Sequence, residues 1–248
     1  MLADEDGDGA IDRVDDDANT EDFDPADLLG KILAFVNQVC SSPQACSFFQ
    51  KLCKDEGLPP LQLLKWVRTR WASLYDLINR ILDVCIPCNK FTLLADEDDK
   101  VPKLKPLKTY SMFRLSEGEW CLLELIRDGL REPAASCQVF SHATRPSIFC
   151  AFPVIEFMQQ KWETMAGDPM YSQIAPALEA GLANLHKWYR ALDESSVYFI
   201  CLILDPRIKL VYFQKHWEQR YLDAGMQTLK TTVSHYSNCA DLLIQTSE

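Results

Sequence analysis

The segment from Lys65 to Ser73 is the part of the sequence where cationic and large aromatic residues alternate. Its cations are Lys65, Arg68 and Arg70, and Trp71 follows directly. A guanidinium group can hold a phosphate through two hydrogen bonds, and an indole ring can stack on an unpaired base. The segment therefore predicts binding to distorted or single-stranded DNA. Composition alone favours another interpretation, in which Trp71 is a core residue and the arginine stems cover apolar surface.

Residues 4 to 15 resemble a calcium-binding loop. Aspartates occupy five of its ligand positions, and Gly9 stands where such a loop needs its sharp turn. An EF-hand also needs a flanking helix on each side and a glutamate at its last position. Here the last position is Asp15, and Asp16-Asp17 follow where an apolar helix start is required. A solvated acidic run is the favoured interpretation.

Cys85 and Cys88 have the spacing of half a zinc site. No second pair of this kind accompanies them, and the four histidines are far apart in the sequence. Two helical cysteines one turn apart are the favoured interpretation. The sequence also contains no glycine-rich phosphate loop and no nucleophile elbow. We therefore expect no catalytic residue, no metal site, no cofactor and no small-molecule substrate.

The elements that must position these residues are predicted to be helices. The chain has 248 residues, of which 48% are hydrophobic and only 9 are glycine. Its apolar residues fall mostly at helical spacing, and their number is sufficient for a sizeable core. The sequence predicts a mainly α protein, an irregular helical bundle, with at most one or two short strands near residues 61–68.

Acidic residues are concentrated at the N-terminus. Residues 1–27 hold twelve acidic residues against Arg13 alone, which leaves 24 basic and 24 acidic residues in the rest of the chain. We expect a disordered acidic tail at 1–24, a single helical domain at 25–240 with a flexible loop at about 95–111, and a C-terminal tail at 241–248. No apolar run approaches the length of a membrane span, and scattered cysteines without a signal segment indicate an intracellular protein.

Cap and turn residues predict where helices begin and end. Asp24-Pro25 and Ser42-Pro43 are typical helix starts, and Gly57 is a typical helix end. An apolar stripe predicts a further helix from Thr69. Ser116 and Glu119 form a capping box that opens a helix, and Pro133 is expected to close that helix.

Three further helical stretches are expected in the C-terminal half. The first covers about 147–165, with a kink at Pro153. The second covers about 170–192. A final amphipathic stretch follows Asp205-Pro206 and runs from Ile208 to about Tyr236. The inward residues expected on the second are Ile174, Leu178, Leu182, Leu185 and Trp188.

Three short motifs resemble, in the same order, motifs of the hAT superfamily of DNA transposases. They are Thr69-Arg70-Trp71-Ala72-Ser73-Leu74-Tyr75-Asp76-Leu77, Leu115-Ser116-Glu117-Gly118-Glu119-Trp120 and Leu204-Asp205-Pro206-Arg207-Ile208-Lys209-Leu210. The resemblance covers about residues 26–220. It implies the helical insertion of an RNase H-like transposase and a nuclear protein; without it we expect a cytoplasmic one.

The resemblance also implies roles for individual residues. Arg70 and Trp71 would face the transposon end, with Trp71 stabilising a displaced base, although Ala72 stands where the family has asparagine. The family's metal-binding carboxylates would fall before Met1 and after Glu248, so we expect a catalytically inactive protein. The expected partners are DNA and other transposase-like chains. The alternatives are a helical scaffold for protein partners and a degenerate transposon remnant without selected function.

Overall fold

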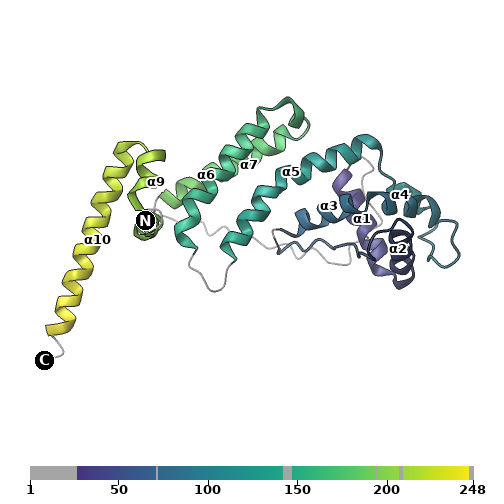
Figure 1. Cartoon of the computed structure of the whole chain (residues 1–248), viewed down its shortest axis with the longest axis horizontal. Coiled ribbons are helices and arrows are strands. Elements are labelled where there is room, and N and C mark those ends of the chain that lie inside the picture. Colours follow the sequence, from purple (N-terminus) through teal and green to yellow (C-terminus); the bar gives the residue numbers. More distant parts are fainter. Residues whose placement is uncertain (1–26, 71, 142–146, 194, 207–208, 246–248) are drawn as a thin grey trace, which may run out of the picture. The chain divides into compact units, whose positions relative to one another are not determined.

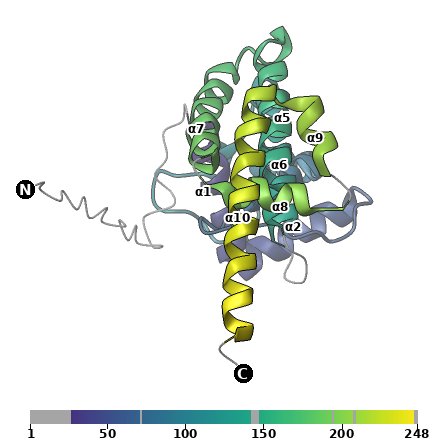
Figure 2. The ribbon, with the colours of Figure 1, turned by 90° about the vertical axis from the view of Figure 1, so that its left-hand side faces the viewer.

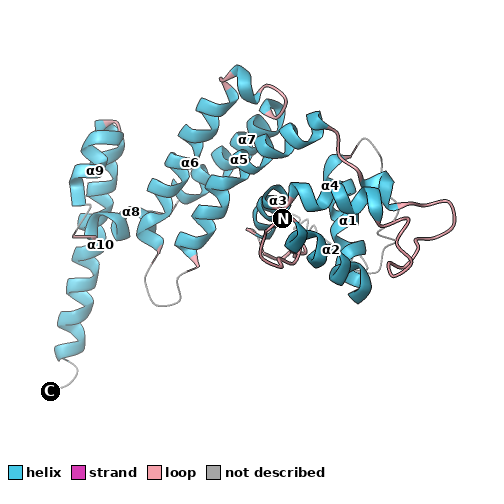
Figure 3. Ribbon diagram, turned by 45° about the vertical axis from the view of Figure 1, so that its right-hand side comes forward, coloured by secondary structure: helices cyan, strands magenta, loops and turns pink. Residues whose placement is uncertain are grey.

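The described residues of the computed structural model are 27–70, 72–141, 147–193, 195–206 and 209–245. They form ten α-helices and three short 3-10 helices and contain no strand (Figures 1 and 3). The prediction of a mainly α protein is therefore confirmed. Residues 61–67 are irregular, so no strand forms there. The acidic tail and its calcium-loop pattern lie outside the described residues.

Contacts between residues divide the chain into two compact units. Unit 1 comprises Met1–Arg68 and Asp76–Trp120, and unit 2 comprises Thr69–Tyr75 and Cys121–Glu248. The single domain expected over 25–240 stays a prediction. Among the described residues, no helix combines the length and the apolar character that a membrane crossing requires.

Unit 1 begins with two helices whose boundaries follow local capping rules. Helix α1 (Leu28–Ser41) starts after Asp27, and the start predicted at Asp24-Pro25 lies outside the described residues. Helix α2 (Pro43–Asp55) begins as predicted, because the Ser42 hydroxyl accepts a hydrogen bond from the Ala45 amide at 3.2 Å. Gly57 follows α2 with φ of 73°, a left-handed conformation that suits glycine at a helix end.

An aromatic cluster forms the core of unit 1. Helices α3 (Ser73–Asp83) and α4 (Cys85–Leu94) and the 3-10 helix η1 (Tyr110–Phe113) complete the unit before α5 begins. Phe91 of α4 is fully buried at the centre of the cluster. Ring centroids lie 5.3–6.0 Å from that of Phe91 for Phe35, Phe48, Phe49 and Tyr110. One ring therefore joins α1, α2, α4 and η1.

Helix α5 (Glu117–Phe140) continues through Pro133, where the sequence predicted its end. Proline lacks an N–H, so the Gly129 carbonyl loses its donor from the next helical turn. Trp162 of α6 (Ala151–Ala166) donates its indole N–H to that carbonyl at 2.9 Å. The predicted end was wrong because a distant residue replaces the missing hydrogen bond.

Helices α6 and α7 (Ala175–Asp193) pack side by side in unit 2 (Figure 1). Pro153 lies in the first turn of α6, where its missing N–H disturbs no helical bond, so the kink expected there has no physical cause. The ring of Trp162 lies against Gly181 of α7, where an added Cβ would stand 2.3 Å from ring atom Cζ3. Two short 3-10 helices, η2 (Ile148–Cys150) and η3 (Pro169–Tyr171), flank α6.

The inward face of α7 is predicted correctly except at its C-terminal end. Ile174, just before α7, and Leu178 and Leu182 are buried, and Leu185 is half-buried. Trp188, predicted to point inward, is 57% exposed. Tyr189 packs against the core of unit 2 in its place. The prediction at Trp188 was wrong because a helical stripe can continue three or four residues after Leu185, and these steps lead to Trp188 and Tyr189, respectively.

The C-terminal part of unit 2 contains helices α8 (Ser196–Leu204), α9 (Lys209–His216) and α10 (Gln219–Gln245). The continuous stretch predicted from Ile208 is therefore wrong, since the helix breaks around Trp217. The Trp217 ring packs on Phe152 and Phe213, with centroids 5.1 and 4.7 Å away. Helix α10 also extends to Gln245, into the segment expected to be a tail.

A single carboxylate joins three elements of unit 2. Glu156 of α6 accepts hydrogen bonds from the Tyr189 hydroxyl at 2.7 Å, the Trp217 indole at 3.0 Å and the Tyr212 hydroxyl. Burial raises the pKa of the Tyr212 phenol well above its ordinary value, and the hydrogen bond to Glu156 raises it further. Tyr212 therefore stays a neutral donor to this carboxylate.

Candidate nucleic-acid interface

The irregular segment that carries the predicted DNA-binding residues is fixed to unit 1 at its N-terminal part. The Leu63 side chain is buried, and the Leu63 carbonyl accepts a hydrogen bond from the Cys40 thiol of α1 at 3.6 Å. Arg80 of α3 donates to the Gln62 carbonyl at 2.9 Å. The backbone is thus held by two helices immediately before the cations begin.

The side chains that follow point to solvent. Lys65, Trp66 and Arg68 are all exposed. The Arg68 guanidinium lies over the Trp66 ring, 5.7 Å from its centroid, within the range of a cation–π interaction. Among the described residues, neither Lys65 nor Arg68 forms an ion pair. Arg68 and Trp66 therefore form an exposed pair in unit 1 that can meet a phosphate and a base, and Lys65 is exposed one residue before Trp66.

The remaining two predicted residues are placed differently. Arg70 is exposed and belongs to unit 2, where its carbonyl accepts hydrogen bonds from the Ser73 hydroxyl at 2.7 Å and the Ser73 amide at 3.1 Å, just before α3. Trp71 lies outside the described residues, so its predicted role in stacking and the alternative of a core position both stay predictions. The structure therefore brings Arg68 together with Trp66, an aromatic residue that was absent from the predicted site, and leaves Lys65 exposed beside them in the sequence.

A second cationic segment was missed as a site by sequence reasoning. Residues 100–116 contain five basic residues and no acidic residue. We call the part that carries these charges, residues 100–114, the cationic loop. A scan for windows without acids would have found it. Its basic residues are Lys100, Lys103, Lys105, Lys108 and Arg114, all but the partly buried Lys108 exposed.

Buried side chains hold the cationic loop against unit 1. The Asp96 carboxylate accepts hydrogen bonds from the amides of Tyr110 at 2.8 Å and Ser111 at 3.1 Å. Tyr110 is buried, and its hydroxyl donates to the Pro102 carbonyl at 3.0 Å. At the tip, Leu107 is fully exposed with φ of 73°, a conformation that non-glycine residues rarely adopt. The loop is therefore anchored at both ends.

Cys85 and Cys88 lie one turn apart in α4, with Cys85 half-buried and Cys88 buried. Cys88 is buried in α4, and burial raises the pKa of its thiol well above the ordinary value, with further contributions from Cys53 and Cys85. Burial therefore favours the neutral thiol, as expected for a cysteine that packs as a small apolar residue. Among the described residues, no three His, Cys, Asp or Glu side chains are grouped to hold a metal ion.

The interior of unit 1 contains a small cavity between α1, α3, α4 and the start of α5. Its volume is about 10 Å³. This is roughly the space of one water molecule, far below that of a metabolite. The lining residues include Phe35, Ile81, Cys88 and Trp120. The cavity is therefore no site for a small-molecule substrate.

Comparisons with protein-family models, curated proteins and solved structures found no match to this chain. The resemblance to hAT transposases stays a prediction that rests on the three motifs. In the structure, Ser116 and Glu119 of the second motif form the predicted capping box, in which the Glu119 amide donates to the Ser116 hydroxyl at 3.3 Å and the Ser116 amide to the Glu119 carboxylate at 2.8 Å.

Proposed function

We propose that this chain is a transposase-derived helical protein that binds nucleic acid through residues 65–68 of unit 1 and does not cleave it. One observation carries the proposal: Lys65, Trp66 and Arg68 are exposed on an irregular segment whose preceding residues are fixed to two helices. A fixed backbone reduces the entropy cost of ordering the side chains on a ligand. Cations supply phosphate contacts and the indole supplies a stacking face, which together suit unpaired strands.

Equilibrium binding to a single-stranded oligonucleotide, followed by fluorescence anisotropy over a range of salt, tests this proposal. The double variant Lys65→Ala/Arg68→Ala should bind more weakly, and its plot of log affinity against log salt should flatten by about 1.4, at roughly 0.7 for each lost phosphate contact. The matched control is Lys51→Ala/Lys54→Ala, which removes the same charge from exposed positions on α2. Equal losses in both variants, or no binding by the unmodified chain at low salt, would reject the site.

Stacking and catalysis need separate measurements. Trp66→Ala should weaken binding by about 1–3 kcal/mol with the salt dependence unchanged, because base stacking on an aromatic ring has that worth and releases no counterions. Arg70→Ala and Trp71→Ala should also weaken binding.

The proposed absence of cleavage has its own test. The chain should leave supercoiled DNA intact in the presence of magnesium or manganese. Metal-dependent nicking would overturn the proposal of inactivity.

The second candidate function is a scaffold for other chains of the same kind, and α10 is the observation that favours it. Leu222 is buried, and Met226 and Leu229 pack on the core of unit 2. The stripe continues, in steps of four and three residues, to Val233 and Tyr236, which are 55% and 70% exposed. Such spacing allows one helix to pack along another. In Figures 2 and 3, α10 extends beyond α8 and α9.

Sedimentation velocity measures this alternative directly. The scaffold function predicts a dimer that Val233→Asp and Tyr236→Asp dissociate, because each places a charge in the packed stripe. Ser234→Asp, on the neighbouring exposed position, should leave the dimer intact. A monomer at all accessible concentrations would remove this candidate.

A further inference from the structure

The acidic N-terminal residues of this chain and its acid-free stretch with the most basic residues, 100–116, are opposite in charge. Residues 1–27 carry a net charge of −11, from twelve acidic residues and Arg13. The cationic loop carries five positive charges and lies in a stretch without any acid. Elsewhere basic and acidic residues balance more closely. Asp96, Glu97, Asp98 and Asp99 directly precede the loop and offset its charge at the Lys100 end, so the attraction for the acidic segment comes mainly from the basic residues beyond them, Lys103 to Arg114.

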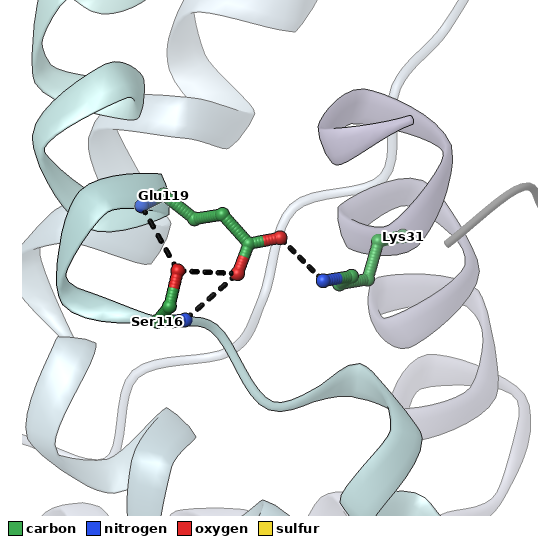
Figure 4. A network of polar contacts seen from close by, with 3 residues as sticks. All are labelled: Lys31, Ser116 and Glu119. Atoms are coloured by element: carbon green, nitrogen blue, oxygen red, sulfur yellow. Dashed lines mark hydrogen bonds and ion pairs between the residues drawn. The ribbon is translucent and has the colours of Figure 1, made fainter. Parts of the chain in front are cut away.

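The fold places the start of α1 next to the end of the stretch that carries the cationic loop. Lys31, in the first turn of α1, is buried and forms an ion pair with Glu119 (Figure 4). The same Glu119 carboxylate accepts hydrogen bonds from the amide and hydroxyl of Ser116, at 2.8 and 2.9 Å. Ser116 follows Arg114 by two residues. The acidic segment therefore joins α1 about one helical turn from the ion pair of Lys31 with Glu119.

The alternative cationic site is farther from that point. The segment that carries Lys65 contacts α1 near its C-terminal end, where the Leu63 carbonyl accepts a hydrogen bond from Cys40. Cys40 lies twelve residues after Leu28, the first residue of α1. That separation is about 18 Å at the rise of an α-helix. Lys65 and Arg68 also supply fewer charges than the cationic loop. A stretch of 26 residues spans at most roughly 90 Å, so reach excludes neither site. The short distance along the fold from the start of α1 to Ser116 favours the loop.

We propose that the acidic segment, residues 1–26, binds the cationic loop of the same chain. Lysine and arginine side chains of the loop would pair with the aspartates and glutamates of the segment at the rim of unit 1. Tethering makes the contact intramolecular, with an effective concentration in the millimolar range for a short linker, so individually weak surface pairs suffice together. This inference does not depend on the proposed binding of nucleic acid, because the site and the ligand are both parts of this chain.

Zero-length carbodiimide cross-linking of the full chain, followed by peptide mass spectrometry, tests the proposal without any nucleic acid. A one-to-one mixture of unlabelled and ¹⁵N-labelled chains separates links within one chain from links between chains. We expect acidic residues of 1–26 to link to Lys100, Lys103, Lys105 and Lys108 in pairs that carry the same label. These links should exceed those to the exposed control lysines Lys51 and Lys54 of α2 at least severalfold.

Salt and charge variants complete the experiment. The screening length falls from about 10 Å at 0.1 M salt to about 3 Å at 1 M, so the links should decrease severalfold over that range. In the Lys103→Gln/Arg114→Gln variant, whose side chains are exposed, links from the segment to Lys100 should also decrease, whereas Lys51→Gln/Lys54→Gln should leave them unchanged. Links concentrated on Lys65, links spread evenly over the lysines, or links between differently labelled chains would overturn the proposal.

Discussion

Glu119 links the capping of α5 to the first turn of α1. Burial opposes its ionisation, but the hydrogen bonds from Lys31 and Ser116 outweigh that effect and lower the pKa of Glu119 below its ordinary value of 4.5. Because the folded-state pKa is the lower one, the ionised carboxylate stabilises the fold fully above about pH 4.5. That contribution is lost as the pH falls through the folded-state pKa.

Glu119→Gln should therefore destabilise the protein more at pH 7 than at pH 3. The measurement is the free energy of unfolding from urea titrations at the two pH values, with the difference between variant and unmodified chain compared. Glu124→Gln, at an exposed position of α5, serves as the control and should show little difference at either pH. An equal cost of Glu119→Gln at both pH values would contradict the assignment.

The same residue shows what sequence predicts at this scale. The capping box of Ser116 and Glu119 follows from a spacing of three residues, so it is visible in the sequence. The ion pair of Glu119 with Lys31 joins residues separated by 88 positions, and no local rule contains that information. The capping box could therefore be predicted from the sequence, whereas the ion pair, which depends on tertiary packing, could not.

Trp162 and Pro133 should be energetically coupled, because the indole of one supplies the hydrogen bond that the other removes from α5. Trp162→Phe leaves the buried Gly129 carbonyl without this donor, at a cost of about 1–3 kcal/mol. Pro133→Ala restores a backbone N–H one turn along the helix. Urea unfolding of the double variant should therefore show a smaller additional cost of Trp162→Phe, with a coupling energy of about 0.5–3 kcal/mol.

Trp188→Phe provides the matched control for this cycle. Trp188 is 57% exposed, so its replacement should change the free energy of unfolding by less than about 0.5 kcal/mol. Additive costs of Trp162→Phe and Pro133→Ala would show that the indole does not replace the helical donor.

Gly181 determines how closely α6 and α7 pack. Gly181→Ala places a methyl group within 2.3 Å of the Trp162 ring, so we expect a loss of about 1–3 kcal/mol. Gly118→Ala in the first turn of α5 is the contrasting change, because an added Cβ there meets nothing within 4 Å and should stabilise the helix by about 0.4–1 kcal/mol. Thermal unfolding followed by circular dichroism measures both, and a stabilising Gly181→Ala would contradict the packing.

Sequence predicts the existence of these helices better than their ends. Ser42-Pro43 and Gly57 give correct boundaries because the groups they satisfy lie within four residues. The end expected at Pro133 and the continuous helix across Trp217 failed, since in both places a side chain from another helix decides the outcome. The apolar periodicity of α7 likewise predicts which side of the helix is buried, but it does not decide whether Trp188 or Tyr189 lies on that side.

The uneven charge of the whole chain should control its solubility. The full chain has an isoelectric point of about 4.9, whereas residues 28–248 hold 24 basic and 24 acidic residues. A chain that begins at Leu28 should therefore have its solubility minimum near neutral pH, because self-association increases where net charge approaches zero. Light scattering across pH 4–8 at low salt measures the shift. A minimum that remains near pH 5 would contradict this account.

The candidate interface illustrates the same limit for the whole molecule. The cations Lys65 and Arg68 could be predicted from composition, because alternating cations and aromatics are visible in the sequence. The stacking of Arg68 on Trp66 depends on side-chain conformation. The sequence predicts the cationic loop only as a surface loop, since neighbouring acids at 96–99 mask its charge in any wider window.

The contact between Trp162 and Gly129 also constrains the order in which substitutions could accumulate in an ancestral lineage. A chain that gained Pro133 while lacking the tryptophan would have carried an unsatisfied buried carbonyl, at a cost of about 1–3 kcal/mol of stability. A chain that gained the tryptophan first, opposite a glycine at 181, would have tolerated the proline afterwards. Reversion of the tryptophan is then blocked for as long as the proline persists, which makes the pair an instance of historical contingency that reconstructed ancestors can examine.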